Sequence, residues 1–380
     1  MSRSSPSGLQ KVSDFVAEIP LALVISDVHL QPKVWARYPE MWGDTYKAFD
    51  HCIELANSAR VPIICLGDLF DKSRPDAESV DCFTRGIDRL FKEFFFIDGN
   101  HDASDPPWPT VLAKRARSLH NQCVELQGVK IRGVSFQTAD KLAATVAEVH
   151  ESAYDVICMH QAWDELQGIG RTGGSIVDVV PPGKLLLTGD YHKRLTMQLP
   201  TPGGIITVHS PGSTCMQAID ESENKFATML VKADTPTGRE VGLVEVPLLG
   251  RPCNRVKVAD EEEFAQLLLK YPGFETKPIL HVTYPDGIEN AFTRLVSMLG
   301  NKAYLFMKCL PSTELDEVQV PGVPAGDRVT LQDAVNILLK EPADIQLANT
   351  LLQTIKSEST VGVTACLDRW LTEGVPGAIS

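Results

Sequence analysis

Eight polar side chains that could bind divalent metal ions follow directly after apolar runs of the sequence. They are Asp27, His29, Asp68, Asn100, His101, His160, Asp190 and His192. Mixed carboxylate, imidazole and amide ligands suit Mn²⁺, Fe²⁺ or Zn²⁺, whereas Mg²⁺ and Ca²⁺ prefer oxygen ligands alone. Eight groups are too many for one ion, but two ions about 3.5–4 Å apart, bridged by a shared carboxylate, would use them well. Such a pair binds a phosphate ester and activates a bridging water, so the pattern predicts a centre for phosphoester hydrolysis.

Two pairs among these residues are spaced two apart along the chain. Asp27 and His29 end one apolar run, and Asp190 and His192 end another. Side chains two residues apart on an extended backbone point the same way, so a carboxylate and an imidazole can hold one ion. A capping aspartate beside a structural histidine would give the same pattern. For Asp27 and His29 taken alone, both interpretations stay open.

These residues need a fold that gathers the ends of several strands. The apolar runs are residues 21–30, 61–66, 94–97, 154–160 and 184–189. The spacing of apolar residues predicts helices over 44–60, 76–92 and 139–152. Further strands are predicted near 123–126, 129–135, 205–209 and 227–233. Alternating strands and helices indicate βαβ units of an α/β fold, which places polar groups at the carboxyl ends of its strands. The charged segment 234–252, which contains Pro and Gly, is interpreted as a domain boundary.

The composition is ordinary for a soluble globular protein, with 43% hydrophobic and 22% charged residues. No stretch approaches the roughly 20 apolar residues of a membrane helix. We therefore expect a flexible N-terminus over residues 1–20, a cytoplasmic location and no membrane partner. Nine cysteines without a C-x-x-C pair are expected to be reduced and buried. The net charge of −13 argues against a broad basic face for nucleic acid, although bound metal ions would add local positive charge.

The series of motifs resembles the calcineurin-like metallophosphoesterases. It runs D-x-H, G-D, G-N-H-D, H and G-x-x-H along the chain, and the resemblance is specific over residues 21–250. Within that family, the segments 67–71, 99–102, 210–214 and 244–248 look most like SbcD, the nuclease subunit type of SbcCD double-strand-break repair complexes. The resemblance implies an α/β fold built as a four-layer β-sandwich flanked by helices. A smaller α/β capping domain and C-terminal helices would complete it.

The resemblance also implies a role for each of the eight residues. Asp27, His29 and His192 would hold the first metal, Asp68 would bridge both metals, and Asn100 and His160 would hold the second. His101 would be the catalytic residue, a general acid or transition-state stabiliser near the leaving oxygen. The family usually has histidine on the second metal where this chain has Asp190, and the anionic oxygen is expected to change the metal preference. The implied cofactors are two divalent ions, Mn²⁺ first, with Mg²⁺, Fe²⁺ or Zn²⁺ as alternatives.

The same resemblance divides the chain and implies partners. Residues 21–250 would form the nuclease domain, and residues 251–325 a capping domain that contacts DNA. Residues 326–380 would form a helical segment that docks onto an SbcC-type coiled-coil ATPase. The nuclease itself would be a homodimer. The implied function is a two-metal-dependent phosphodiesterase, an exonuclease or endonuclease in double-strand-break repair or DNA end processing. The alternative is a metallophosphatase or phosphodiesterase for a small phosphorylated molecule or a phosphoprotein.

Overall fold

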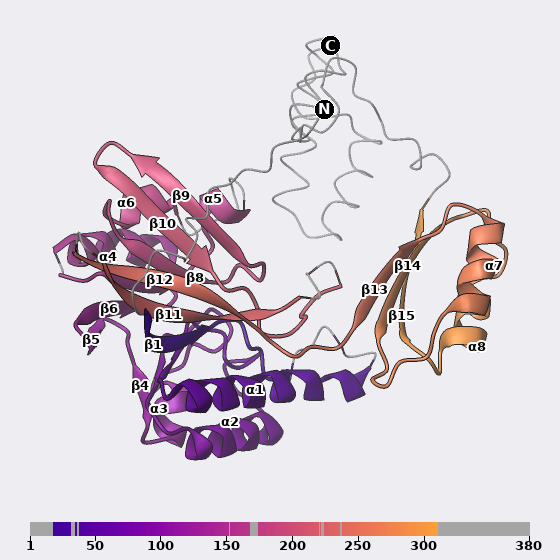
Figure 1. The fold of residues 1–380 in the computed structure, drawn as a ribbon, viewed down its shortest axis with the longest axis horizontal. Coiled ribbons are helices and arrows are strands. Elements are labelled where there is room, and N and C mark those ends of the chain that lie inside the picture. Colours follow the sequence, from indigo (N-terminus) through magenta and orange to yellow (C-terminus); the bar gives the residue numbers. More distant parts are fainter. Residues whose placement is uncertain are drawn as a thin grey trace, which may run out of the picture. The chain divides into compact units, whose positions relative to one another are not determined.

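The computed structural model describes residues 18–31, 35, 38–151, 153–167, 174–219, 221, 224–235 and 238–310. It shows a mixed α/β fold of several sheets and helices (Figure 1). The chain divides into two compact units that alternate along the sequence. The first contains the chain up to Lys257 together with Ala265–Val282 and Asn290–Met307, and the second contains Val258–Phe264, Thr283–Glu289 and the chain from Lys308. The eight predicted site residues all belong to the first unit.

A six-stranded sheet of the first unit has the order β12-β11-β1-β2-β3-β4. Its strands are β1 (Glu18–Ile25), β2 (Ile63–Cys65), β3 (Phe94–Phe96), β4 (Ala116–Ser118), β11 (Phe226–Thr235) and β12 (Gly238–Pro247). Strands β1 to β4 run parallel, whereas β11 pairs antiparallel with β1 and with β12. The carboxyl ends of β1, β2 and β3 therefore meet at one edge, where polar residues follow them.

A second six-stranded sheet of the same unit has the order β5-β6-β7-β8-β10-β9. Its strands are β5 (Gln122–Leu126), β6 (Val129–Val134), β7 (Val156–His160), β8 (Leu185–Gly189), β9 (Leu195–Thr201) and β10 (Gly204–Ser210). Strands β6, β7, β8 and β10 are parallel to one another. The carboxyl ends of β7 and β8 supply the remaining predicted site residues.

Alternating apolar side chains make the two sheets stack. In β1, Ile25 faces a core shared with helices, while Val24 faces the second sheet. In β8, Leu187 faces the first sheet, while Leu186 faces a helix-covered core on the other side. The helices of these outer cores are α1 (Gly43–Ala59), α2 (Ala77–Arg89), α4 (Ala139–Glu151) and α6 (Ile176–Val179). The layers are thus helix, sheet, sheet and helix, and the predicted α/β fold class is confirmed.

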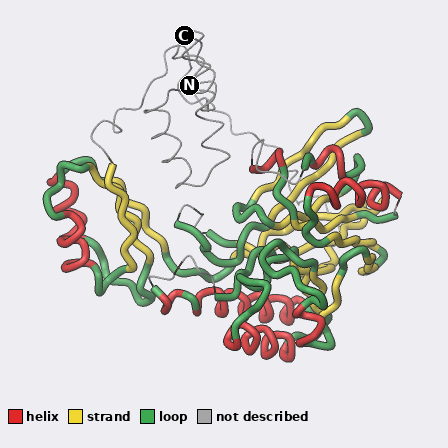
Figure 2. The backbone as a smooth tube through the Cα atoms, turned by 180° about the vertical axis from the view of Figure 1, so that it is seen from behind, coloured by secondary structure: helices red, strands yellow, loops and turns green. Residues whose placement is uncertain are grey.

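Helices α1 and α2 lie side by side against the first sheet in both views (Figure 1 and Figure 2). Phe49 of α1 and Phe83 of α2 meet with ring centroids 6.1 Å apart, and both are fully buried. The Asp76 carboxylate caps α2 by accepting the backbone N–H of Ser79 at 3.0 Å. This packing makes a rigid base beneath the strands that carry Asp27 and Asp68.

A third sheet has the order β13-β14-β15. Its strands are β13 (Cys253–Lys257), β14 (Ile279–Pro285) and β15 (Tyr304–Leu310), and the helices between them are α7 (Glu261–Lys270) and α8 (Ala291–Leu299). The family resemblance implied a smaller α/β domain in this part of the chain. The predicted domain limits at residues 250 and 325 stay predictions, and residues 1–17 and 311–380 lie outside the described part. Among the described residues, no helix is long and apolar enough to cross a membrane.

Three strands were missed by the sequence prediction, namely β4, β9 and β12. Within the segment 234–252, which was interpreted as a domain boundary, residues 238–247 form β12 and pair with the whole of β11. Strand β9 was also missed, and no residue of it is fully buried. All three are edge strands with exposed residues, so their sequences carry charged or polar residues beside the apolar ones.

The remaining short elements are the 3₁₀ turn η3 (Pro39–Met41), α3 (Trp108–Leu112) and α5 (Asp164–Gln167). Of these, α5 bears directly on the predicted site, because Gln167 contacts Asp190.

Candidate metal centre

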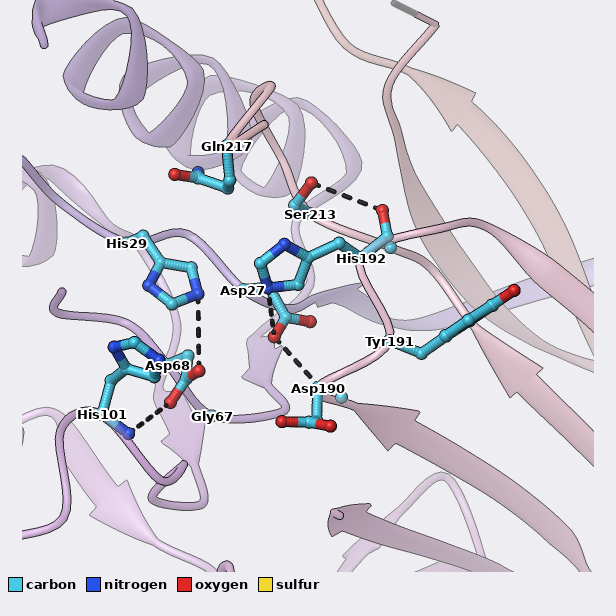
Figure 3. Close-up of polar contacts among 12 residues, drawn as sticks. Asp27, His29, Gly67, Asp68, His101, Asp190, Tyr191, His192, Ser213 and Gln217 are labelled. Carbon is cyan, nitrogen blue, oxygen red and sulfur yellow. Dashed lines mark hydrogen bonds and ion pairs between the residues drawn. The ribbon is translucent and has the colours of Figure 1, made fainter. Parts of the chain in front are cut away.

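The structure brings all eight predicted residues to one place, where strands from both six-stranded sheets end. The first sheet supplies Asp27, His29, Asp68, Asn100 and His101, and the second supplies His160, Asp190 and His192. Backbone hydrogen bonds join the first two loops, since the N–H groups of Asp27 and His29 donate to the carbonyls of Gly67 and Asp68. Side chains separated by more than 160 residues therefore share one cluster (Figure 3).

Three sets of residues could each hold a metal ion, because within each set the potential ligand atoms lie within 4.8 Å of one another. The sets are Asp27, His29 and His192; Asp27, Asp68 and His160; and His29, Asp71 and His101. Asp27 belongs to the first two sets, so its carboxylate could be shared by two ions. The bridging role assigned to Asp68 stays a prediction, and the geometry adds Asp27 as a second carboxylate that could be shared.

Asp68 contacts histidines on both sides. Its Oδ2 lies 3.4 Å from Nε2 of His29 and 3.5 Å from Nε2 of His160. Its Oδ1 accepts the backbone N–H of His101 at 3.0 Å (Figure 3). The amide oxygen of Asn100 lies 3.0 Å from the same Nε2 of His160. Asp68 is therefore at the centre of the cluster.

Several atoms of the cluster are buried without a hydrogen-bond partner in the described part of the chain. They are Oδ2 of Asp27 and both ring nitrogens of His29, which face the carboxylates of Asp68 and Asp71 at 3.4 Å without hydrogen-bond geometry. Leaving such polar atoms unsatisfied costs about 1–3 kcal/mol each. Divalent cations bound by the carboxylate and imidazole groups would satisfy them, and the donor set suits Mn²⁺, Fe²⁺ or Zn²⁺. The residues present therefore fit the two-metal centre that was predicted.

Four of the eight residues have a left-handed backbone. The φ angles are 49° for Asp27, 45° for His29, 49° for Asp68 and 73° for Asp190. Positive φ is uncommon for residues other than glycine, although aspartate and histidine tolerate it better than most. Strained backbone of this kind gathers at functional sites, because there the direction of a side chain matters more than local stability.

Gly99 makes room for the central carboxylate. A Cβ atom at this position would lie 1.9 Å from Oδ1 of Asp68, closer than any contact between real atoms. The glycine in the G-N-H-D motif is therefore required for Asp68 and His101 to approach each other. That steric requirement explains why the motif begins with glycine.

Electrostatic contacts shift the ionisation of the cluster. Burial disfavours charge on Asp68, but the charge and hydrogen bond of His160 outweigh it and lower the pKa of Asp68. At His160, burial is outweighed by the charge of Asp68, which raises its pKa to about 10. Burial raises the pKa of Asp190. In the ion-free protein, imidazole protons thus balance the carboxylates, and metal binding would have to displace them.

Asp190, which follows a strand of the second sheet, is held in position by contacts of its backbone and of its side chain. Its Oδ1 lies 3.9 Å from Nε2 of His160, and its backbone N–H donates to Oδ1 of Asp27 at 3.1 Å. The side-chain amide of Gln167 donates to its Oδ2. One carboxylate oxygen is therefore held by Gln167, and the other faces His160.

Sequence reasoning missed three acidic residues that shape the site. Asp71, in the segment 67–71, places Oδ1 3.4 Å from Nδ1 of His29. Asp102 ends the G-N-H-D motif and is buried behind the cluster. Glu221 contacts His192 at 2.8 Å. The motifs could have pointed to Asp71 and Asp102, whereas Glu221 lies in a polar segment with no recognisable signal.

We predict that Asp102→Ala destabilises the protein by about 3 kcal/mol. The Asp102 carboxylate accepts backbone N–H groups of Leu69 at 2.8 Å, Phe70 at 3.2 Å and Gly99 at 2.8 Å, which ties two metal-site loops together. Urea unfolding of the ion-free protein measures the change. The matched control is Asp155→Ala, at an exposed residue that accepts the N–H of Lys130. This variant should lose about 0.5 kcal/mol of its free energy of unfolding. Equal losses would show that Asp102 does not hold the loops.

Comparison with protein families gives one match. A model described as calcineurin-like phosphoesterase matches residues 21–211, about half of the 380-residue chain. A search of curated proteins found no match. Among solved structures, an archaeal phosphodiesterase that is described as novel is 13% identical, with a TM-score of 0.33. That alignment covers 60% of this chain and 100% of the archaeal chain.

Proposed function

Because this chain belongs to the calcineurin-like phosphoesterases, a family of metal-dependent hydrolases of phosphoester bonds, we propose that it is a two-metal phosphodiesterase that cleaves DNA. The observation that carries the proposal is a buried Asp and His cluster with orphaned ligand atoms and an exposed histidine, His101, at its mouth. Asp27, His29, Asp68 and His160 are buried, whereas Asn100 and His101 are exposed. A substrate phosphate would therefore enter on the side of the G-N-H-D motif.

Each ligand would have a defined place. One ion would be held by Asp27, His29 and His192, the other by Asn100, His160 and Asp190, with Asp68 between them. When bound, two divalent ions supply the Lewis acidity that polarises a phosphodiester and activates the attacking water. The contribution of the chain is to hold these ligands at fixed positions and to supply a proton.

His101 is placed to supply that proton. Its Nδ1 lies 3.2 Å from the backbone carbonyl of Asp71, which can only accept a hydrogen bond, so Nδ1 donates. In the imidazolium form Nε2 also carries a proton, which it can give to the leaving oxygen while Nδ1 keeps its own. The ring packs edge-on against His29 with centroids 4.8 Å apart, and this contact limits its rotation.

DNA is proposed as the substrate because the motifs resemble the SbcD-type nucleases. The test is incubation of the full chain with linear duplex DNA and Mn²⁺, beside an aryl phosphodiester and a chelator control. We expect fragments only when Mn²⁺ is present. Turnover of the aryl phosphodiester without any cut in single- or double-stranded DNA would contradict the nuclease proposal and leave a phosphodiesterase.

The alternative, an esterase for a small phosphorylated molecule or a phosphoprotein, is favoured by charge. The chain carries a net charge of −13, and two lysines in the predicted capping domain donate to backbone carbonyls of the same chain. The ammonium of Lys277 donates to the Gly300 carbonyl at 2.9 Å, and that of Lys302 donates to the Tyr271 carbonyl at 3.3 Å. In the incubation above, this alternative would appear as turnover of the aryl phosphodiester without cleavage of DNA.

Asp190→His is expected to shift the metal preference of the centre toward softer ions. Imidazole favours Zn²⁺ over Mn²⁺ more than carboxylate does, and histidine tolerates the positive φ of this position. We predict that the ratio of Zn²⁺ to Mn²⁺ affinity rises about tenfold or more, equivalent to about 1.4 kcal/mol. Competition dialysis measures that ratio. An unchanged ratio would place residue 190 outside the ligand set.

We further propose that residues 326–380 dock onto a coiled-coil ATPase of SbcC type and that the nuclease forms a homodimer. This segment lies outside the described residues, and the proposal depends on the amphipathic pattern of its sequence. Truncation after residue 326 should leave aryl phosphodiester turnover unchanged and remove ATP-stimulated cleavage of duplex DNA. Loss of both activities would count against a docking role.

A further inference from the structure

Glu221 is a buried acid that none of the predicted ligand sets contains. Its side chain is 4% exposed, and its Oε1 lies 2.8 Å from Nδ1 of His192. On the opposite side of that imidazole ring, Nε2 lies 3.7 Å from Oδ1 of Asp27. His192 is therefore held between a buried carboxylate and the predicted first metal site.

The second oxygen of Glu221 is fixed by three donors. Oε2 accepts the hydroxyl of Ser213 at 2.8 Å, the backbone N–H of Gln217 at 3.1 Å and the ammonium of Lys225 at 2.6 Å. Lys225 also donates to the hydroxyl of Ser213 at 2.7 Å, and its side chain is 5% exposed. These contacts leave the carboxylate little freedom to rotate, so they fix where Oε1 stands.

The segment that carries these donors is attached to the loop of the first ligand pair. Ser213 forms a β-bridge with Ser26, and the side-chain amide of Gln217 donates to the Val28 carbonyl at 3.2 Å. Arg255 donates to the backbone carbonyl of Glu221 from the other side. These contacts fix the position of Glu221 relative to Asp27 and His29.

We propose that Glu221 is a positioning residue that fixes the tautomer and ring direction of His192 for the first metal. A carboxylate that accepts the Nδ1–H of a histidine leaves the Nε2 lone pair free for an ion. The inference rests on the metal centre of the proposed function, but not on DNA as the substrate. A simple ion pair with Lys225 would need only one oxygen, whereas here the other oxygen faces His192.

The experiment measures metal binding without substrate. Mn²⁺ is titrated into the full chain, and free Mn²⁺ is counted by its electron paramagnetic resonance signal. The variants are Glu221→Ala, which removes the acceptor, and Glu221→Gln, which keeps a neutral one. Glu125→Gln, on an exposed position of β5, is the matched control. If Glu221→Ala does not fold, the double variant Glu221→Gln with Lys225→Met removes both buried charges together.

We expect wild type to bind two ions, and Glu125→Gln to bind each of them as tightly as wild type does. In Glu221→Ala, one ion should bind about 10–100-fold more weakly while the other is unchanged, and Glu221→Gln should recover part of the loss. Unchanged affinity for both ions, or an equal loss of both, would overturn the inference. No Mn²⁺ binding by wild type would overturn the metal centre with it, whereas normal binding without DNA cleavage would overturn only the nuclease proposal.

Discussion

Asp68→Ala is expected to lose bound metal and at least about 10³-fold of phosphodiesterase activity. Asp68 contacts His29 and His160 with one oxygen and the His101 backbone with the other, so its removal disconnects both halves of the site. Two-metal sites supply several kcal/mol of transition-state stabilisation, and about 4 kcal/mol corresponds to the stated loss. Elemental analysis and turnover of an aryl phosphodiester measure the two effects.

The backbone at this position calls for a second variant. Asp68 has a φ of 49°, which alanine adopts poorly, so Asp68→Ala could act through strain alone. Asp68→Asn tolerates the same backbone and keeps the shape of the side chain, but it lacks the negative charge. We expect it to lose activity as Asp68→Ala does. Two ions retained in Asp68→Asn, with activity near wild type, would show that the carboxylate does not bridge and that Asp27 is the shared ligand.

The central strands and the site residues were predictable because both carry strong local signals. Residues 21–25, 63–65 and 156–159, which lead to Asp27, Asp68 and His160, are all apolar and buried, as a strand covered on both faces requires. Parallel strands of one sheet end at the same edge, so polar residues that follow such runs must gather there. Only the family resemblance predicted that both sheets contribute to one cluster. The spacing of apolar residues in a sequence does not indicate how two sheets pack on each other.

What sequence reasoning missed depends on distant contacts. Strand β12 is an edge strand whose alternation contains Arg239, Glu240 and Glu245, and its pairing with β11 decides its structure. The role of Glu221 could not be predicted because it depends on the contact with His192, which lies 29 positions away along the chain. Gln167 becomes informative only once the fold brings it to Asp190. Glu221 and Gln167 thus each act through a partner that no spacing rule identifies.

His101→Gln is expected to keep both metal ions and lose about 10²–10⁴-fold in turnover. His101 is exposed at the mouth of the cluster, and only its backbone N–H contacts the central Asp68. Glutamine can still donate to the Asp71 carbonyl, but it cannot transfer a proton. His150, exposed on α4, is the control histidine, and His150→Gln should retain full activity. Mn²⁺ stoichiometry and initial rates are measured on the same preparations.

The leaving group decides which role His101 plays. A general acid matters most when the departing oxygen is strongly basic, as in DNA or an alkyl phosphodiester, and least for a weakly basic phenolate such as p-nitrophenolate. If His101 protonates the leaving oxygen, His101→Gln should lose much more activity on the alkyl substrate than on the aryl one. Equal losses on both would instead make His101 a stabiliser of transition-state charge. Loss of a metal ion together with activity would make it a ligand, in line with its proximity to His29 and Asp71.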